Sequence, residues 1–492
     1  MMSWRRYPTI YEINTRVWLF ELGEKTGRSV DLGSVPSATW DHIAAYGFDA
    51  VWLMGVWRRS PASMAIANRN HRLLGEFKLA LPDFQPQDNI GSAYSVRDYI
   101  VDQALGGPQG LAVARHELAK RGIRLILDFV PNHLALDHPW VAEHAEYFIQ
   151  GNPDDAKNDP DSFVEVSGKV FACGRDPYFP AWQDVLQLNA FHPGLRKAEI
   201  ETVADIARQC DGIRCDMAML LLNTIFEATW GNRAGLKPTT EYWPDLIAAI
   251  KTAHPEFLFV AEAYWDREWE LQQQGFDYCY DKQFYDRLTD GKAEEIRGHL
   301  HADPGYQAKL LRFIENHDEQ RAATAFTFQR QRAAAVAMAT VPGAKLFHEG
   351  QLEGRSIRLP VFLRRRVGEP VNQPIQDFYT KLLRATDTSV FRQGNWTLHR
   401  CTGWPENSTY QNLVAWSWTD ADERSLVVVN FSDSSAQGRI QVLWNDLPGK
   451  AWRLVDQFSG EVYVRSGDEM RNQGLYVGLN PWGFHFFQYQ IM

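Results

Sequence analysis

The chain has 492 residues, more than one hydrophobic core usually serves, which predicts two or three domains. Acidic side chains outnumber basic ones by 61 to 51, and the net charge of −10 argues against a nucleic-acid binder or an anionic-membrane binder. The five scattered cysteines show no Cys-x-x-Cys spacing, which argues against a disulfide framework or a zinc site. The first residues lack the apolar core of a signal peptide, and no apolar run has transmembrane length, so a cytoplasmic protein is predicted.

The first three quarters of the chain alternate short β-rich runs with helical segments. The predicted strands span residues 9–19, 48–57, 123–130, 211–217, 257–265, 276–281, 309–318 and 343–351. The predicted helices span residues 37–46, 108–121, 195–209, 242–254, 268–274, 282–301, 328–339 and 375–386. A loop rich in Gly, Pro and polar residues is expected after the second strand.

Eight strand–helix units predict an α/β fold of the closed (β/α)8 type, the TIM barrel. Strand–helix alternation implies parallel strands joined by right-handed crossovers. Six units would favour an open doubly wound sheet, but no Gly-x-Gly-x-x-Gly or Walker loop follows any predicted strand. The barrel is assigned to residues 1–133 and 190–388.

Two segments depart from this alternation. Residues 134–189 are rich in Pro, Asp, Asn and Gly, and predict a loop insertion after the third strand, at the barrel face where loops build active sites. Residues 389–492 contain short alternating β segments separated by turn residues. This purely β pattern predicts an antiparallel β-sandwich domain.

Acidic residues stand at the ends of four predicted strands. Asp128 ends the third strand, Asp216 the fourth, Glu262 the fifth and Asp318 the seventh. Because the carboxyl ends of barrel strands meet at one face, these side chains are expected to converge there. A single strand-end acid often caps the next helix, whereas several acids together repel one another and are typical of a functional site.

Glycoside cleavage would explain such a group of acids. It needs a carboxylic acid that protonates the leaving oxygen and a carboxylate on the other side of the sugar; a separation of about 5–5.5 Å gives retention through double displacement. Arg214 and Asp216 lie two residues apart on one face of their strand, so the guanidinium is expected to keep Asp216 ionised. Glu262 stands among apolar and aromatic residues, which favour a protonated general acid.

Four segments resemble the signature segments of the α-amylase family, glycoside hydrolase family 13. They read DFVPNH at residues 128–133, GIRCD at 212–216, EAYW at 262–265 and FIENHD at 313–318, in the order of the family. The resemblance spans the whole chain, with the insertion as domain B and the β-sandwich as domain C. It implies a retaining hydrolase of O-glycosyl bonds in carbohydrate metabolism, with Asp216 as nucleophile, Glu262 as general acid/base and Asp318 as transition-state stabiliser.

The same resemblance implies a substrate-binding set around these acids. Arg214 would orient the nucleophile, and His133 and His317 would bind hydroxyls of the sugar in the cleavage subsite. Tyr94, in the segment GSAYSVRDY, would stack under that sugar.

Asp128 and Asn132 would support the loop after the third strand. Asn132 also corresponds to a calcium ligand in many family members, and a structural hydrogen bond is the alternative interpretation of this residue. No cofactor is expected to be required, and a structural calcium ion is left open. The expected partner is an oligosaccharide or polysaccharide α-glucoside, and no sequence feature indicates the oligomeric state.

Four positions depart from the common pattern of the family. Met219 and Leu220 stand where many starch-cleaving members carry a Lys-His pair, and Gly91 stands where many exo-acting members carry an aspartate. Leu186 stands where proline is common near the end of the insertion. The substrate is therefore assigned only as a class, α-glucans, maltooligosaccharides or small α-glucosides, with endo or exo action open.

Two alternative functions are kept. The same covalent intermediate could pass to a second sugar, which would make the protein a transglycosylase, for example a glucanotransferase or an enzyme acting on sucrose or trehalose. A non-catalytic carbohydrate-binding member is the other alternative, because a fold does not imply a function. The presence of all three acids argues against that second alternative.

Overall fold

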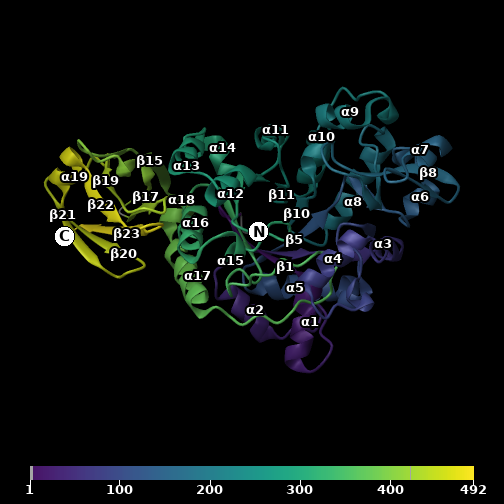
Figure 1. The fold of residues 1–492 in the computed structure, drawn as a ribbon, viewed down its shortest axis with the longest axis horizontal. Helices are drawn as coiled ribbons and strands as arrows, with labels where there is room; N and C mark the ends of the chain where they lie inside the picture. Colours follow the sequence, from purple (N-terminus) through teal and green to yellow (C-terminus); the bar gives the residue numbers. More distant parts are fainter. Residues whose placement is uncertain (1–3, 422, 492) are drawn as a thin grey trace.

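The computed structural model describes residues 4–421 and 423–491 and contains a closed barrel of eight parallel strands (Figure 1). Around the barrel the strands follow the order β1, β14, β13, β12, β11, β10, β5 and β2. The predicted (β/α)8 barrel is confirmed, and each predicted strand is present. Their bounds are β1 Thr9–Asn14, β2 Ala50–Met54, β5 Arg124–Phe129, β10 Gly212–Cys215, β11 Leu258–Ala261, β12 Tyr278–Tyr280, β13 Leu310–Arg312 and β14 Ala344–His348.

The barrel strands are apolar on both faces because both faces are covered. Side chains at alternating positions fill the interior, as Trp52 and Ile126 do, whereas their neighbours Val51 and Leu125 point outward to the helices. This double burial explains why the strands read as nearly continuous apolar runs. A polar residue in such a run is therefore conspicuous.

Helices that follow the strands form the outer layer. Seven of the predicted helices agree with the structure to within two residues at each end: α2 Ser37–Ala44, α5 Gly107–Lys120, α8 Pro193–Ala207, α10 Tyr242–Ala253, α11 Glu268–Gln273, α16 Phe328–Thr340 and α17 Gln373–Thr386. Further helices are α9 Asn223–Trp230, α14 Pro304–Ala308 and α15 Ala322–Ala325. The single helix predicted over residues 282–301 is wrong, because the chain is interrupted around Gly291 into α12 Lys282–Thr289 and α13 Ala293–Leu300.

The predicted first strand is too long. β1 ends at Asn14, whose side-chain oxygen accepts a hydrogen bond from Val17 N (3.4 Å) and caps the helix α1 Thr15–Thr26. The β-branched and aromatic residues of this segment favour a strand locally, but the helix buries Val17, Leu19 and Leu22. The expected loop after the second strand also contains regular elements: β3 Trp57–Arg59, α3 Pro61–Ala67, α4 His71–Ala80 and β4 Val96–Val101.

The insertion after β5 forms a small antiparallel sheet with two short helices. The strand order is β6 His133–Ala135, β9 Trp182–Gln187, β8 Lys169–Gly174 and β7 Phe163–Val166, and the helices are α6 Pro139–Glu143 and α7 Pro153–Asn158. The first and last strands pair, with His133 opposite Gln187. The insertion therefore leaves and re-enters the barrel at one point and presents His133 there.

The C-terminal segment folds into two antiparallel sheets, as predicted. The six-stranded sheet has the order β15 Asn395–His399, β17 Leu413–Asp420, β18 Glu423–Asn430, β23 Phe484–Ile491, β20 Ala451–Asp456 and β21 Val462–Ser466. The three-stranded sheet contains β16 Cys401–Thr402, β19 Ala436–Ile440 and β22 Leu475–Leu479. Contrary to the purely β pattern, this segment also contains α18 Ser389–Gln393 and α19 Gly467–Gln473.

Strand β17 joins the C-terminal domain to the barrel. Leu413 and Ala415 pack with the three-stranded sheet, while Trp416 and Trp418 on the opposite face pack with the barrel core. Trp416 Nε1 donates to the hydroxyl of Thr340 (3.1 Å), and Trp418 Nε1 donates to its backbone oxygen (2.5 Å). The end of α16 is thus tied to the sheet by two indole hydrogen bonds.

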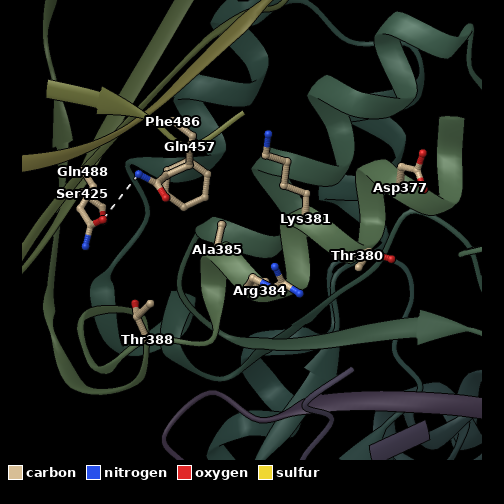
Figure 2. A pocket seen from close by; sticks show the side chains of 10 residues that line it. All are labelled: Asp377, Thr380, Lys381, Arg384, Ala385, Thr388, Ser425, Gln457, Phe486 and Gln488. Atoms are coloured by element: carbon tan, nitrogen blue, oxygen red, sulfur yellow. Dashed lines mark hydrogen bonds between the residues drawn. The ribbon is translucent and has the colours of Figure 1, made fainter. Parts of the chain in front are cut away.

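A cavity of 410 Å³ lies between α17 and the six-stranded sheet (Figure 2). Lys381 and Arg384 line it from the helix, Gln488 lines it from β23, and Gln457 lines it from the turn after β20. The predicted site residues are not among its lining residues, so the junction of the two domains is separate from the predicted active site.

No helix within residues 4–421 and 423–491 is long and apolar enough to cross a membrane. Each of the five cysteines is a free, buried thiol. Burial raises the pKa of Cys173, Cys210 and Cys401 to about 12. These thiols are therefore unreactive at neutral pH.

The substitution Thr340→Val should destabilise the protein by about 1–3 kcal/mol, because it removes the acceptor of the buried Trp416 indole while keeping the side-chain shape. The midpoint of urea unfolding measures this loss. The matched control is Thr252→Val on α10, whose exposed hydroxyl makes the same helical hydrogen bond (2.7 Å to Ala248 O) and serves no indole. Equal midpoints for the two variants would contradict the role given to Thr340.

Candidate active site

Two of the predicted catalytic acids meet on one guanidinium. Asp216 directly follows β10 and Glu262 directly follows β11, and these two strands are neighbours in the barrel. Arg214 Nη1 lies 2.5 Å from Asp216 Oδ1, and Arg214 Nη2 lies 2.7 Å from Glu262 Oε1. Arg214, Asp216 and Glu262 are 1%, 5% and 3% exposed. Arg214 and Asp216 share a strand face as predicted, and the contact of Arg214 with Glu262 is additional.

Aromatic rings surround the same guanidinium. Its central carbon lies 5.1 Å from the ring centre of Tyr94, 5.5 Å from that of Trp52 and 5.7 Å from that of Tyr280. The faces of these rings attract a cation and keep water away from it. The charge of Arg214 is therefore compensated mainly by the two carboxyl groups that it contacts.

Glu262 is hydrogen-bonded through both of its oxygens. Oε2 accepts from Met217 N (2.6 Å), and Oε1 accepts from the hydroxyl of Tyr264 (3.0 Å). Met217 adopts a left-handed backbone (φ 45°), a costly conformation that is often found at functional turns. Burial raises the pKa of Glu262 to about 7, because the neighbouring Arg214 offsets only part of this effect and the charge of Asp216 adds to it. Near neutral pH this group can carry a proton and donate it.

Asp318 lies beyond β13, and its side chain is 45% exposed. His317 Nε2 lies 3.0 Å from Asp318 Oδ2 and 2.8 Å from the hydroxyl of Tyr94, while His317 Nδ1 contacts Glu12 Oε1. Desolvation alone would raise the pKa of Asp318, but the charge and the hydrogen bond of His317 outweigh it and lower this pKa to about 2. Asp318 is therefore a carboxylate at neutral pH.

The predicted sugar-binding residues lie around these acids. The ring of His133 lies 5.2 Å from that of Trp182, both in the insertion, and burial lowers its pKa although the charge of Asp216 acts in the opposite direction. His133 is thus neutral and can both donate and accept a hydrogen bond. Tyr94 stacks on His317, with ring centres 5.3 Å apart and an interplanar angle of 23°.

Asn132 is engaged by the insertion. Gln187 Nε2 donates to the side-chain oxygen (3.0 Å) and to the backbone oxygen (2.9 Å) of Asn132, and Leu188 N donates to the same backbone oxygen (3.0 Å). In the part of the chain that the structure describes, no three His, Cys, Asp or Glu side chains are grouped as a metal site would need. The amide oxygen that would bind calcium is thus part of the joint between barrel and insertion.

Asp128 supports a different loop from the expected one. Its side-chain oxygens accept from Trp52 Nε1 (3.1 Å) and Gly55 N (2.7 Å), and its backbone oxygen accepts from Trp57 Nε1 (2.8 Å). Gly55 and Trp57 follow β2, so Asp128 fastens the loop after the second barrel strand. Of the two residues predicted to support the loop after the third strand, Asn132 does so.

Three further residues lie at the site although the sequence assigned them no role: Glu12, Tyr264 and Tyr280. Glu12 did leave a signal, since a carboxylate inside the apolar run of β1 is unusual. Tyr264 belongs to the segment EAYW, but neither it nor Tyr280 gave a signal of its own, because aromatic residues in and after strands usually belong to the core.

The structure shows the surroundings of three of the residues that depart from the family pattern. Met219 and Leu220 lie in the buried 3-10 turn Ala218–Leu221 and are 0% and 3% exposed, so they offer no polar contact to a substrate. Gly91 has a left-handed backbone (φ 81°), and Arg59 Nη1 donates to its carbonyl oxygen (2.7 Å). An aspartate at position 91 would be strained in this loop.

The family model of the alpha-amylase catalytic domain matches residues 37–413. Alpha-amylase MalA of Haloarcula japonica is 23% identical over 445 residues, which cover 87% of this chain and 56% of that protein. The alpha-1,4-glucan:maltose-1-phosphate maltosyltransferase of Bifidobacterium longum is 30% identical over 278 residues, 54% of this chain and 31% of that protein. The chain thus spans 56% of the length of the first relative and 31% of the length of the second.

Solved structures agree with the fold. A maltogenic alpha-amylase, AmyB, from Thermotoga neapolitana superposes with a TM-score of 0.69 at 18% identity, over 99% of both chains. At this identity the likeness concerns the fold alone, whereas the family model covers most of the barrel sequence. The chain belongs to the α-amylase family, glycoside hydrolase family 13, whose matched members include glycosidases and a glycosyltransferase.

Proposed function

We propose that this protein is a retaining glycoside hydrolase that cleaves α-glucosidic bonds of α-glucans, maltooligosaccharides or small α-glucosides. The observation that carries the proposal is the guanidinium of Arg214, which contacts Asp216 and Glu262 at once. It brings a carboxylate beside a cation together with a carboxyl group whose pKa is about 7. A nucleophile and a proton donor in this arrangement meet the needs of glycoside cleavage.

In the first step, an oxygen of Asp216 attacks the anomeric carbon while the bond from this carbon to the leaving oxygen breaks. Glu262 transfers its proton to the leaving oxygen, so the leaving sugar departs as a neutral alcohol. The product is a glycosyl ester of Asp216. Asp318, ionised because of His317, would bind sugar hydroxyls and stabilise the positive charge that develops on the ring.

In the second step, water attacks the anomeric carbon of the ester. Ester formation has removed the negative charge of Asp216 but has left Arg214 in place, so the pKa of Glu262 falls and Glu262 can accept the proton of the water. The carbon–oxygen bond to Asp216 breaks, which regenerates its carboxylate. Two inversions give a product of the original α configuration.

The surroundings suit a chain of glucose units. His133 and His317 offer hydrogen bonds to the sugar at the cleavage point, and Tyr94 offers a ring face. Tyr178 of the insertion is 66% exposed, and its ring packs edge-on against Trp265 at 4.8 Å. Because Trp265 lies three residues after Glu262, this aromatic pair suits stacking of further glucose units.

A transglycosylase is the second candidate function. The ester of Asp216 can pass to a second sugar or to phosphate instead of water, and the similarity to the maltosyltransferase of Bifidobacterium longum favours this possibility. The presence of Asp216, Glu262 and Asp318 together argues against a non-catalytic carbohydrate-binding role. The cytoplasmic location and the absence of nucleic-acid and membrane partners stay predictions.

Product analysis tests the proposed function. The purified protein is incubated with maltooligosaccharides, isomaltose, sucrose and trehalose, with and without excess acceptor sugar, and products are followed by NMR and mass spectrometry. We expect shorter products that appear first as α anomers. Longer or rearranged products would establish the transglycosylase instead, and β anomers would exclude retention. The Asp216→Ala variant should be inactive on every substrate.

The substitution Glu262→Gln should remove proton donation and keep the side-chain shape. We expect a loss of about 10²–10⁴-fold in kcat/KM on maltooligosaccharides, and a much smaller loss on activated aryl glucosides, whose leaving groups need no proton. The matched control is Glu199→Gln, a buried glutamate of α8 that is bonded to the Tyr242 hydroxyl (2.8 Å) and should leave both rates unchanged. Equal losses of Glu262→Gln on both substrates would contradict its assignment as the acid.

The pH profile checks the same carboxyl group. Because the protonated form donates, kcat/KM on maltooligosaccharides should fall as the pH rises through about 7, the pKa of Glu262. The pKa of Asp318 is about 2, so its ionisation does not limit activity near neutral pH. An alkaline limb that persists unchanged in Glu262→Gln would belong to another group and would refute this origin.

We also propose that no metal ion or other cofactor is required, and that Asn132 has a structural role. The support is that both of its oxygens already accept hydrogen bonds from Gln187. Prolonged treatment with EDTA should leave kcat/KM and the thermal unfolding midpoint unchanged. A lower midpoint that added calcium restores would overturn this proposal.

A further inference from the structure

Glu12 is a carboxylate buried inside the barrel. It lies in β1 two residues after Ile10, which faces the interior, so its side chain points inward as well. In the sheet it is in register with Trp52 of β2 and with His348 of β14, and it is 0% exposed. A charge at this depth is costly unless a partner compensates it.

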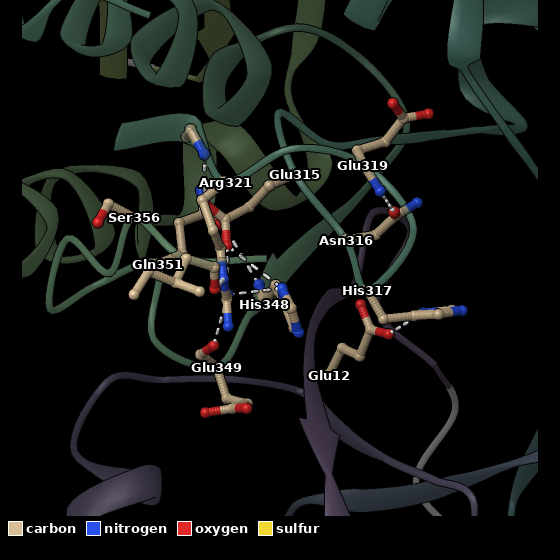
Figure 3. A network of polar contacts seen from close by, with 12 residues as sticks. Glu12, Glu315, Asn316, His317, Glu319, Arg321, His348, Glu349, Gln351 and Ser356 are labelled. Carbon is tan, nitrogen blue, oxygen red and sulfur yellow. Dashed lines mark hydrogen bonds and ion pairs between the residues drawn. The ribbon is translucent and has the colours of Figure 1, made fainter. Parts of the chain in front are cut away.

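The partner of Glu12 is His317. Glu12 Oε1 contacts His317 Nδ1 (Figure 3), whereas no described residue makes a hydrogen bond to Glu12 Oε2. His348, next to Glu12 in the sheet, cannot take this role, because burial and the charge of Arg321 lower its pKa to about 3 and leave it neutral. The negative charge of Glu12 is therefore balanced by the imidazole of His317.

His317 connects Glu12 to the proposed site. Its second nitrogen, Nε2, faces Asp318 Oδ2 at 3.0 Å and the Tyr94 hydroxyl at 2.8 Å. An imidazole ring with a carboxylate next to each nitrogen can donate a hydrogen bond to both carboxylates only if both nitrogens carry protons. Burial opposes this charge, but Asp318 and Glu12 together raise the pKa of His317 well above its usual value.

Several charged or titratable groups surround this imidazole. They are Glu12 from β1, Asp128 from β5, His348 from β14, Tyr94 from the loop before β4 and Asp318 from the loop after β13. Among the acids, Glu12 and Asp318 contact the ring nitrogens directly. Glu12 is the one of these two that is fully buried.

We propose that Glu12 is a positioning residue for the reaction, which keeps a proton on each ring nitrogen of His317 and aims the Nε2 proton at Asp318. The inference rests on the proposed function, because Asp318 is the residue that would stabilise the transition state. Glu12 does not contact the substrate in this scheme. Its effect is transmitted by the ring of His317, whose orientation and charge set the position of the Asp318 carboxylate.

Loss of Glu12 should therefore act on the transition state more than on substrate binding. Without a carboxylate at Nδ1, His317 can lose its proton at neutral pH or turn its ring, and Asp318 loses its cationic neighbour. An interaction of this kind lowers kcat, while KM changes little. Misplacement of a catalytic group typically costs roughly tenfold to hundredfold.

The first test reads the protonation of His317 directly and needs no turnover. The protein contains 14 histidines, and ¹⁵N-histidine labelling with a His317→Gln spectrum assigns the ring signals of His317. In the wild type both nitrogens should stay protonated at neutral pH, because Asp318 and Glu12 raise the pKa of His317 well above its usual value. In Glu12→Gln, His317 should lose its second proton at a lower pH than in the wild type. A His317 titration that is identical in both proteins would overturn the proposal.

The matched control is Glu315→Gln. Glu315 is also 0% exposed and also paired with a cation, since Arg321 Nη1 donates to it (2.7 Å), but it lies in a separate group with His348 (Figure 3). This control should leave the titration of His317 as in the wild type. Should Glu12→Gln fail to fold, Glu12→Leu replaces it: an apolar side chain of similar size removes the carboxylate from the barrel interior, so an unchanged His317 titration in Glu12→Leu would equally overturn the proposal.

The second test is kinetic. On a maltooligosaccharide that the wild type cleaves, Glu12→Gln should lower kcat roughly tenfold to hundredfold with KM within about threefold, and should move the alkaline limb to lower pH. Glu12→Asp should recover part of kcat. A large rise in KM at constant kcat would contradict positioning. If the wild type cleaves no α-glucoside, the proposed function fails while the spectroscopic result on Glu12 still stands.

Discussion

The guanidinium of Arg214 is the interaction on which the proposed site depends. It lies in the barrel interior with a carboxyl group on each of its terminal nitrogens and aromatic rings around it. Neither carboxyl group would be stable at this depth without the cation, because burying an unpaired charge costs several kcal/mol. Burial raises the pKa of Glu262 in spite of this cation, which is the property that the proposed general acid needs.

Polar side chains gather near the ends of the barrel strands in two groups. In each group, carboxylates contact basic side chains. One set runs from Glu12 through His317 to Asp318, and the other joins Glu315, Arg321 and His348. Each set contains both carboxylate and cationic partners, so neither leaves a large net charge inside the apolar barrel. The contrast between a raised and a lowered pKa, at Glu262 and at Asp318, arises from these different neighbours.

The insertion and the C-terminal domain are attached to the barrel by different kinds of contact. The insertion is joined by hydrogen bonds between Asn132 and Gln187 at the edge of the site, and it brings His133 towards Asp216. The C-terminal domain is joined on the far side of the barrel through Trp416 and Trp418, which bury large apolar rings against α16. The first joint shapes the proposed substrate site, and the second stabilises the barrel at a distance from it.

The sequence by itself determined the order of the strands, the barrel and the convergence of Asp216, Glu262 and Asp318. Strand periodicity and the positions where strands end are local properties of the sequence, and the barrel topology brings the strand ends together at one face. It did not determine α1, since packing of Val17 and Leu19 overrides local strand propensity. It also did not reveal that Arg214 contacts Glu262 or that Glu12 holds His317. Glu12 and His317 are 305 residues apart, and only closure of the barrel between β1 and β14 brings β1 beside the strands that end at the site. Side-chain partners across such distances are decided by tertiary packing, which sequence patterns do not encode locally.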